Sequence, residues 1–443
     1  MKKHINKLRR VLGVAFGIAV VVGGTIGVGI LRAPSTIAAV LPSAPMILLC
    51  WILVGIYILL SASSYAELTT MLPKAGGAYN YIKRAFGGYA GFLNGWFDFI
   101  CNAIAPAYFC IVLSEYTTLI FPGIKPYTTL VAILFLSFFT LFNLPGVKSG
   151  SSIQQVTSAA KVLLFLVLIG GCFFSEHTTT IQSINTPLLS GGMFIAVFKS
   201  LQLIMGSYDG WMSVSFFAEE DQDPGHNIPK SYMIGALTVM LLYVLVNAAI
   251  LYVLPVSAIA NSTLAASDAA SVAFGRWSKN LIIMIALFSL FSILNAYMMI
   301  PSRILFGLSR DGYFIKQGTI LNKGGTPYIS LLFCYTIATT MILLSSFEQL
   351  FALGAFMMTM VTGFAFLSLI YLRKKEPTLH RPYKAWGYPF STYFAFIVTI
   401  ALFIGFAISD QFSFLVILSL IIFSYPFYNL FIRKRNKLAT QLQ

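Results

Sequence analysis

Charged residues are scarce in this sequence. Asp, Glu, Lys and Arg together make up 10% of the 443 residues, and no stretch is both long and polar enough to form a soluble domain. The four histidines (His4, His177, His226 and His380) all lie outside the apolar segments. Because histidine is the commonest protein ligand for metals and haem, metal or haem chemistry within these segments is not indicated.

Cysteine is also infrequent, and its placement excludes a disulfide framework. All five cysteines, Cys50, Cys101, Cys110, Cys172 and Cys334, fall inside apolar segments. The apolar segments contain no pairing of histidine with serine or cysteine of the kind that nucleophilic catalysis needs. We therefore expect no catalytic residues, no metal and no cofactor.

Apolar residues, in contrast, are abundant and are arranged in long runs. They make up 58% of the chain, in runs of about 20 residues, the length that crosses a bilayer as a helix. This pattern predicts an all-α integral membrane protein forming one domain over residues 1–443. About twelve spans are expected, near residues 13–37, 44–71, 88–120, 127–145, 153–175, 192–218, 230–255, 281–305, 328–345, 349–371, 391–409 and 412–432.

The formal net charge of +15 would suit nucleic-acid binding, but the distribution of the basic residues favours a membrane topology instead. If the N-terminus is cytoplasmic, only Arg32, Lys125, Arg276 and Lys279 fall in external segments. Most of the other basic residues then lie on the cytoplasmic side, as the positive-inside rule requires. The basic start followed by an apolar run resembles a signal peptide, but it lacks an A-x-A cleavage site, so we expect a retained first span. The sequence thus predicts both termini in the cytoplasm of a cell, with a bacterial inner membrane as the expected location.

The first apolar span carries four glycines within seven residues, in Gly23-Gly24-Thr25-Ile26-Gly27-Val28-Gly29. Glycine weakens a helix by about 1 kcal/mol relative to alanine, so the cluster favours a break at mid-membrane depth. Such a break offers N–H donors at the start of its second half and carbonyl acceptors at the end of its first, which suits a zwitterion. The alternative is a helix-packing face of small residues.

A second interruption is expected in the sixth span, at Met205-Gly206-Ser207-Tyr208-Asp209-Gly210-Trp211. Breaks at corresponding positions in two oppositely oriented halves are typical of inverted-repeat transporters. The first repeat is expected at residues 13–175 and the inverted second repeat at 192–371, with two additional spans at 391–432.

Ionisable residues inside spans are candidates for function because their burial is costly. Lys161 lies deep in the fifth span and is the strongest of these candidates, whereas Lys199 can extend outward to the interface. Asp98 could either complete a polar network or pair with a basic partner. Glu67 and Glu115 lie towards span ends and are expected to be structural.

Acidic residues in and after the sixth span have two roles left open. Asp209 precedes Gly210 and is expected to cap a restarted helix rather than to contact a cationic substrate. Glu219 and Glu220 are either part of a solvated loop or part of an inner gate. Their candidate basic partners in such a gate are Arg9, Arg10, Arg303 and Arg310.

The ordered run of motifs resembles the amino acid–polyamine–organocation (APC) superfamily, and in particular amino acid permeases similar to the L-type amino acid transporters. The resemblance covers nearly the whole chain, although each motif alone is weak. It rests on Gly24-Thr25-Ile26-Gly27-Val28-Gly29-Ile30, Tyr65-Ala66-Glu67-Leu68, Met71-Leu72-Pro73-Lys74-Ala75-Gly76-Gly77-Ala78-Tyr79, Gly95-Trp96, Tyr208-Asp209-Gly210-Trp211, Ala218-Glu219-Glu220, Asn227-Ile228-Pro229, Arg310-Asp311-Gly312, Thr326-Pro327, Arg381-Pro382-Tyr383 and Gly387-Tyr388-Pro389.

This resemblance implies a LeuT-type fold with broken spans one and six and amino acid transport by alternating access. It places the substrate carboxylate on N–H groups near Val28 and Gly29, and the amine on carbonyls near Thr25, Gly206 and Ser207. Lys161 matches the lysine that takes the place of sodium in sodium-independent relatives, so coupling by proton symport or exchange is expected. The expected substrate-binding residues are Thr25, Ile26, Gly27, Val28, Gly29, Gly206, Ser207, Tyr208 and Asp209, the coupling residue is Lys161, and the candidates for a gate or polar network are Asp98, Glu219 and Glu220.

Two positions depart from the family pattern. Asp209 replaces a glycine of the animal transporters, which keeps a polyamine or cationic amino acid carrier open as the alternative function. Gly206 stands where relatives carry a large gating aromatic, so a gap of aromatic size is expected. A large apolar substrate side chain is the favoured occupant of this gap, with closure by Met205 or Tyr208, or weak occlusion, as the other outcomes.

Neutral L-amino acids are the expected substrates, and a non-transporting sensor would have the same site without turnover. The expected partners are an amino acid, the lipid bilayer and protons. Neither a nucleic acid nor an obligate protein partner is indicated.

Overall fold

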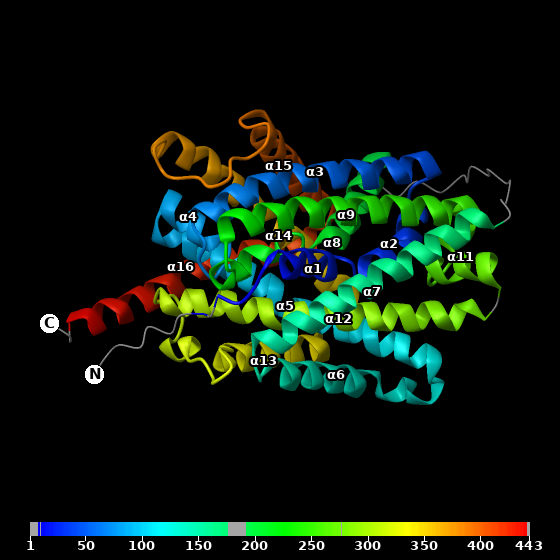
Figure 1. Ribbon diagram of the computed structural model, residues 1–443, viewed down its shortest axis with the longest axis horizontal. Helices are drawn as coiled ribbons and strands as arrows, with labels where there is room; N and C mark the ends of the chain where they lie inside the picture. Colours follow the sequence, from blue (N-terminus) through cyan, green and yellow to red (C-terminus); the bar gives the residue numbers. More distant parts are fainter. Residues whose placement is uncertain (1–7, 9, 176–191, 276, 441–443) are drawn as a thin grey trace.

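The computed structural model describes residues 8, 10–175, 192–275 and 277–440, and these residues are almost entirely helical (Figure 1). The elements, in order, are α1 Val14–Thr25, α2 Val28–Ala38, α3 Ala44–Met71, α4 Tyr79–Phe86, α5 Gly88–Ile120, η1 Pro122–Tyr127, α6 Thr128–Asn143, α7 Val147–Phe174, α8 Gly192–Tyr208, η2 Ser213–Glu220, α9 Pro224–Val253, α10 Val256–Ala260, α11 Ala265–Phe274, α12 Ser278–Arg310, η3 Lys316–Thr319, α13 Tyr328–Leu344, α14 Phe347–Lys375, α15 Phe390–Ser409 and α16 Gln411–Thr440.

The described residues contain 10 helical segments long and apolar enough to cross a membrane, counting α1 and α2 together as one. Helices α8 and α13 are 17 residues long each and are shorter than these 10 segments. The all-helical membrane fold predicted from the sequence is confirmed. The count of twelve spans and the inverted repeat stay predictions.

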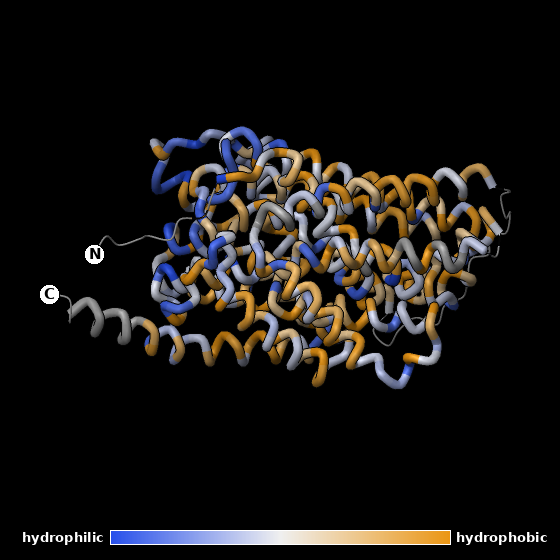
Figure 2. Tube along the Cα trace, turned by 60° about the horizontal axis from the view of Figure 1, so that its bottom comes forward, coloured by the Kyte–Doolittle hydropathy of each residue, from blue (hydrophilic) through white to orange (hydrophobic). Residues whose placement is uncertain are grey.

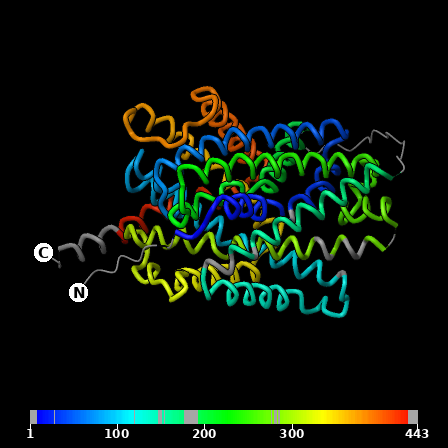
Figure 3. Tube along the Cα trace, in the orientation of Figure 1, coloured from blue at the N-terminus to red at the C-terminus, as the bar shows by residue number. Residues whose placement is uncertain are grey.

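Helices α1 and α2 lie inside the bundle and are surrounded by longer helices (Figures 1 and 3). Helix α1 packs against α7, α9 and α12, and α2 packs against α8. Helices α5 and α12 are buried along most of their length, whereas α16 and α6 expose large apolar side chains such as Leu134 and Phe423. This gradient is expected of a bundle whose rim faces lipid rather than water.

The two ends of the bundle differ in polarity (Figure 2). We call the end that holds the start of α1 and the end of α16 the terminal end, and the other the opposite end (Figure 1). Hydrophilic residues gather at the terminal end, where α4, the last turns of α12 and α14, and the segment between α14 and α15 lie (Figures 1 and 2). These segments contain Lys83, Arg310 and Arg373. All three are among the basic residues that the sequence predicted on the cytoplasmic side.

The segment before α1 is fixed to the end of the sixth span by backbone hydrogen bonds. The N–H groups of Val11 and Leu12 donate to the Glu220 carbonyl at 2.9 and 3.0 Å, and the Gln222 N–H donates to the Leu12 carbonyl at 2.9 Å. This isolated bridge is the only β-type pairing among the described residues. It closes the terminal end between the first and sixth spans.

Candidate functional site

The first break lies where the glycine pattern predicted it. Helix α1 ends at Thr25, Ile26 is extended with φ −74° and ψ 101°, and α2 begins at Val28 after Gly27. Because the chain leaves helical geometry here, carbonyls that would have accepted intrahelical hydrogen bonds turn towards neighbouring helices. The break therefore needs partners from elsewhere in the bundle.

Lys161 of α7 donates hydrogen bonds to two of these carbonyls. Its ammonium group donates to the Gly23 carbonyl at 3.0 Å and to the Ile26 carbonyl in a shorter contact, and the residue is only 1% exposed. No carboxylate lies within ion-pair distance of Lys161 among the described residues. The Lys161 side chain thus satisfies two carbonyl oxygens of the first break.

The second break differs from the one predicted. Helix α8 ends at Tyr208 and a turn follows, but the chain restarts as the 3-10 helix η2 at Ser213, with Met212 as its N-cap. Gly210 has φ +102°, which glycine adopts without strain, and its N–H donates to the Asp209 carboxylate at 2.9 Å. The prediction that Asp209 caps a restarted helix is therefore wrong, because Asp209 stabilises the turn that precedes η2.

Tyr243 of α9 joins the two breaks, and it was not among the residues predicted for the site. Its hydroxyl lies 2.8 Å from the Thr25 carbonyl and 2.8 Å from the Ser207 carbonyl. These are two of the carbonyls expected near a substrate amine. A tyrosine in an apolar span carries no motif, so only the three-dimensional arrangement could identify it.

Glycines of the first break also permit close contact between helices. A Cβ atom on Gly23 would lie 2.2 Å from Ser158 Oγ of α7, and one on Gly29 would lie 2.4 Å from Ser207 Oγ of α8. On Gly210, a Cβ atom would lie 2.4 Å from the Gly24 carbonyl oxygen. The two explanations left open by the sequence, a helix break and a small-residue packing face, therefore both apply.

The first N–H groups of α2 are available to an anion. Helix geometry leaves the N–H groups of Val28, Gly29 and Ile30 without intrahelical acceptors, and the helix dipole adds a positive potential there. A cavity of about 270 Å³ reaches this point from the opposite end, lined by residues that include Gly29, Arg32, Leu203 and Phe351. The start of α2 is thus next to an open path.

The expected gap beside Gly206 is occupied by the protein. A Cβ atom on Gly206 would lie 2.8 Å from Cε1 of the Phe351 ring, which comes from α14. The expectation of a free space for a large substrate side chain is therefore wrong for this conformation. Neither Met205 nor Tyr208 is the residue that fills the gap.

Asp98 of α5 has no ion-pair partner among the described residues. It is fully buried, and its Oδ1 accepts a hydrogen bond from Asn102 at 2.9 Å, while Oδ2 has no hydrogen-bond partner there. Of the two roles that the sequence left open, the geometry agrees with a polar network. Lys199 is exposed on α8, as expected of a side chain that extends outward.

Glu67 and Glu115 form contacts of the structural kind that the sequence suggested. Glu67 accepts hydrogen bonds from Arg373 at 2.7 Å and from the Ala385 N–H at 2.6 Å, which fixes the segment after α14. Glu115 pairs with Arg32 at 3.2 Å near the opposite end.

The acidic pair after the sixth span contacts two of its four candidate partners. Glu220 pairs with Arg303 at 3.0 Å, with both side chains almost fully buried, and Glu219 pairs with Arg310 at 2.9 Å. Arg9 lies outside the described residues, and Arg10 has no ion pair with either glutamate within the described part of the chain. These contacts tie η2 to α12 at the terminal end.

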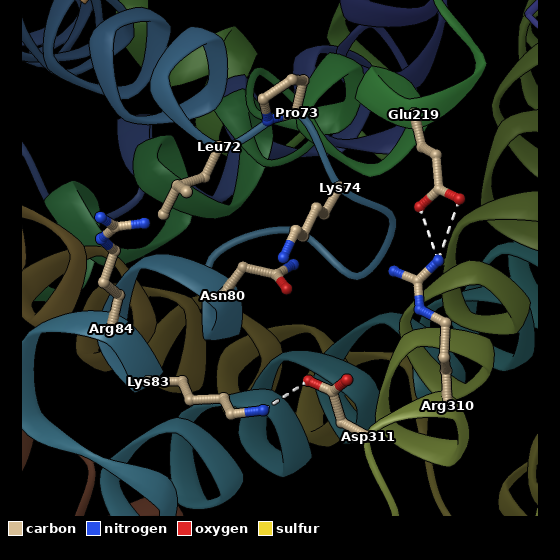
Figure 4. Close-up of a pocket in the computed structure, with 9 residues that line it drawn as sticks. All are labelled: Leu72, Pro73, Lys74, Asn80, Lys83, Arg84, Glu219, Arg310 and Asp311. Atoms are coloured by element: carbon tan, nitrogen blue, oxygen red, sulfur yellow. Dashed lines mark hydrogen bonds and ion pairs between the residues drawn. The ribbon is translucent and has the colours of Figure 1, made fainter. Parts of the chain in front are cut away.

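Glu219 and Arg310 also border a cavity of about 430 Å³ at the terminal end (Figure 4). Figure 4 shows Arg310 pointing at both carboxylate oxygens of Glu219, and Lys83 pointing at Asp311, 2.7 Å away. Glu219 additionally accepts a hydrogen bond from the Ala75 N–H at 2.9 Å. The predicted ion pairs are confirmed, while their role as a gate stays a prediction.

No group of His, Cys, Asp and Glu side chains suited to a metal ion is found in the described ranges, and all five cysteines are free and buried. Two interrupted spans that meet inside an apolar helical bundle, next to a cavity, define the protein class. It is a multi-pass membrane transporter for a small solute.

The chain belongs to the amino acid permease family, whose model matches residues 13–425. It is 27% identical to the serine/threonine exchanger SteT of Bacillus subtilis over 402 residues, covering 88% of this chain and 89% of that protein. It is 29% identical to the mouse b(0,+)-type amino acid transporter 1 over 86% of this chain and 79% of the relative. For the mouse large neutral amino acids transporter small subunit 2, the identity is 28%, over 85% and 73% respectively. The family and these relatives are amino acid transporters rather than enzymes, and the resemblance found in the sequence is confirmed.

Proposed function

We propose that this chain carries neutral amino acids by alternating access without sodium. The observation that supports this most directly is the Lys161 ammonium group on the Gly23 and Ile26 carbonyls. Oxygen atoms of an unwound segment are the usual sodium ligands in broken-helix transporters. With a fixed cation already bound to two of them, a metal cation is not needed to balance the break.

The substrate carboxylate would bind the free N–H groups at the start of α2, around Val28 and Gly29. The amine would bind carbonyls near Thr25, Gly206 and Ser207, where it would compete with the Tyr243 hydroxyl. A zwitterion satisfies both halves of such a site, since one of its ends is an anion and the other a donor. Ile26, Gly27, Tyr208 and Asp209 would complete the lining.

Exchange of one amino acid for another is the mode that the similarity to the serine/threonine exchanger SteT favours, and proton symport is the other. In either mode Lys161 is the coupling residue, because a change in its charge would free the carbonyls of the first break. Glu219, Glu220 and the polar network of Asp98 would act as the inner gate.

The terminal end would face the cytoplasm of a bacterial inner membrane. The concentration of basic residues at this end supports this orientation through the positive-inside rule. Residues 13–175 and 192–371 would form the inverted repeats, with 391–432 outside them, and the chain would need no obligate protein partner.

A carrier of polyamines or cationic amino acids is the second candidate. It is favoured by the buried Asp209 carboxylate beside the second break and by the buried Asp98. In this structure, however, Asp209 already accepts a hydrogen bond from the Gly210 N–H at 2.9 Å, and the Tyr297 hydroxyl lies close to its carboxylate. These contacts favour a structural role for Asp209.

The test is uptake of a labelled amino acid panel into proteoliposomes, with and without internal substrate. Neutral amino acids should be carried, and amino acid amides should not compete, because the start of α2 requires the free carboxylate. Equal competition by amides would show that the carboxylate site is misplaced. Inhibition by a polyamine alone would favour the second candidate, and binding without flux would indicate a sensor.

A further inference from the structure

The ring of Phe351 occupies the space that the absent side chain of Gly206 leaves open. A Cβ atom on Gly206 would lie 2.8 and 2.9 Å from two carbons of this ring, so no larger residue fits while the ring is in place. The two residues belong to different helices, α8 and α14. An aromatic group therefore covers the second break without being part of it.

Phe351 is held in place by other aromatic side chains. It stacks on Phe347, one turn earlier in α14, at 5.1 Å and 24°, and Tyr108 of α5 meets it edge-on at 5.6 Å and 87°. The guanidinium of Arg32 lies 4.8 Å from the centre of the Phe347 ring. The ring is thus connected through Phe347 to the start of the first span's second half.

The same residues lie between the second break and the opposite end. Phe347, Phe351 and Arg32 all line the 270 Å³ cavity that reaches Gly29. Arg32 is also 3.7 Å from Glu348 of α14, in a pair whose side chains are 30% and 71% exposed. A pair this exposed is weak and adds little to the attraction between α2 and α14.

We propose that Phe351 is the outer gate of the substrate site and limits the size of the substrate side chain. This proposal rests on the proposed function and adds to it the substrate class, small neutral amino acids. The ring excludes water from the second break when α14 lies against α8, and it moves away with α14 when the Arg32–Glu348 pair opens. Because buried aromatics each cover roughly 150–250 Å², the space that a large substrate side chain would use is already filled.

The proposal predicts that the site has room for one aromatic ring, at position 351 or at position 206, but not for both at once. In proteoliposomes, the unmodified protein should prefer alanine and serine to leucine and phenylalanine. Phe351→Ala should shift that ratio towards the large substrates by about tenfold or more, the scale of pocket discrimination by size. Gly206→Phe alone should block uptake because its ring collides with Phe351, and Gly206→Phe/Phe351→Ala should regain uptake and the preference for small substrates.

Phe356→Ala is the matched control. Phe356 is on the same helix and fully buried, but its ring packs against Phe403 of α15 at 5.0 Å, away from the break. Its loss should lower thermal stability in detergent without changing the ratio of large to small substrates. Phe351→Leu, which keeps most of the volume, should give an intermediate ratio and serves if Phe351→Ala does not fold.

Three results would overturn the gate. These are an unmodified protein that prefers large substrates, an unchanged ratio in both Phe351 variants, and a double variant no better than Gly206→Phe. All three results can be obtained only if the unmodified protein binds amino acids. If no member of the panel binds or is carried, it is the proposed function that fails, so the two failures are distinguishable.

Discussion

The two breaks satisfy their backbone groups in different ways. At the first, the Gly23 and Ile26 carbonyls depend on the Lys161 side chain from another helix. At the second, local backbone hydrogen bonds form the turn, with the Asp209 N–H on the Gly206 carbonyl at 3.2 Å and the Ser213 N–H on the Gly210 carbonyl at 2.9 Å. Tyrosine hydroxyls of α9 bind the Ser207 and Met212 carbonyls in addition. The first break is therefore the one that a single side chain can open, and the second is a locally folded turn.

Loss of Lys161 should give the largest effect. Lys161→Ala removes two hydrogen bonds from a charged donor, each contributing roughly 1.5–3 kcal/mol, so uptake should fall by about 100-fold or more. Lys199→Ala, on the exposed side of α8, is the matched control and should retain uptake. Uptake by a well-folded Lys161→Ala protein at the unmodified rate would remove the distinction between the breaks.

Loss of the buried ion pair between Arg303 and Glu220 should have the second largest effect. Arg303→Met leaves Glu220 charged and unpaired in a buried position, which should lower the free energy of unfolding by about 3–5 kcal/mol. Arg310→Ala breaks the more exposed pair with Glu219 and should cost about 0–1 kcal/mol. Thermal unfolding in detergent measures both, and equal effects would show that η2 does not depend on its buried partner.

Gly210→Ala tests whether the turn of the second break sets the contact with the first. The new residue would need a positive φ, which costs roughly 1–3 kcal/mol, and its Cβ would press on the Gly24 carbonyl. Uptake and thermal stability should both fall. Gly170→Ala, with open space around its Cβ in α7, should be neutral or stabilising, and a Gly210 variant that behaves the same way would contradict the assignment.

Tyr243→Phe should lower stability less than the Arg303 and Gly210 variants do. It removes a hydroxyl shared by the Thr25 and Ser207 carbonyls, a loss of about 0.5–1.5 kcal/mol. Tyr57→Phe removes a comparable hydrogen bond to Thr399, 2.8 Å away and outside the breaks, and is the matched control. We expect both variants to lose similar stability and only Tyr243→Phe to change substrate affinity. Unchanged substrate affinity in both variants would exclude Tyr243 from the site.

Much of the fold followed from the sequence because the bilayer imposes simple rules. Apolar runs of sufficient length predicted the helices, and four glycines within one run predicted the break at Ile26 and Gly27. Two partners of Glu219 and Glu220 were among the candidates because acidic residues at the end of a helix need nearby basic side chains, and Arg303 and Arg310 were expected on the same side of the membrane. These features depend on composition within a segment, which a sequence displays directly.

Features that depend on contacts between distant segments were missed. Nothing in the sequence connects Gly206 with Phe351, which come together only when α8 packs against α14. Tyr243 was missed for the same reason. The role of Asp209 was misjudged because its preference for helix caps was overridden by the positive φ of Gly210, which directs the chain into a turn first.

The cation requirement of uptake tests the central claim most directly. Uptake of a labelled neutral amino acid should be measured in proteoliposomes with sodium, and again with all sodium replaced by choline. If Lys161 takes the place of a metal cation at the first break, the two rates should be equal. Strict dependence on sodium in the unmodified protein would contradict this account.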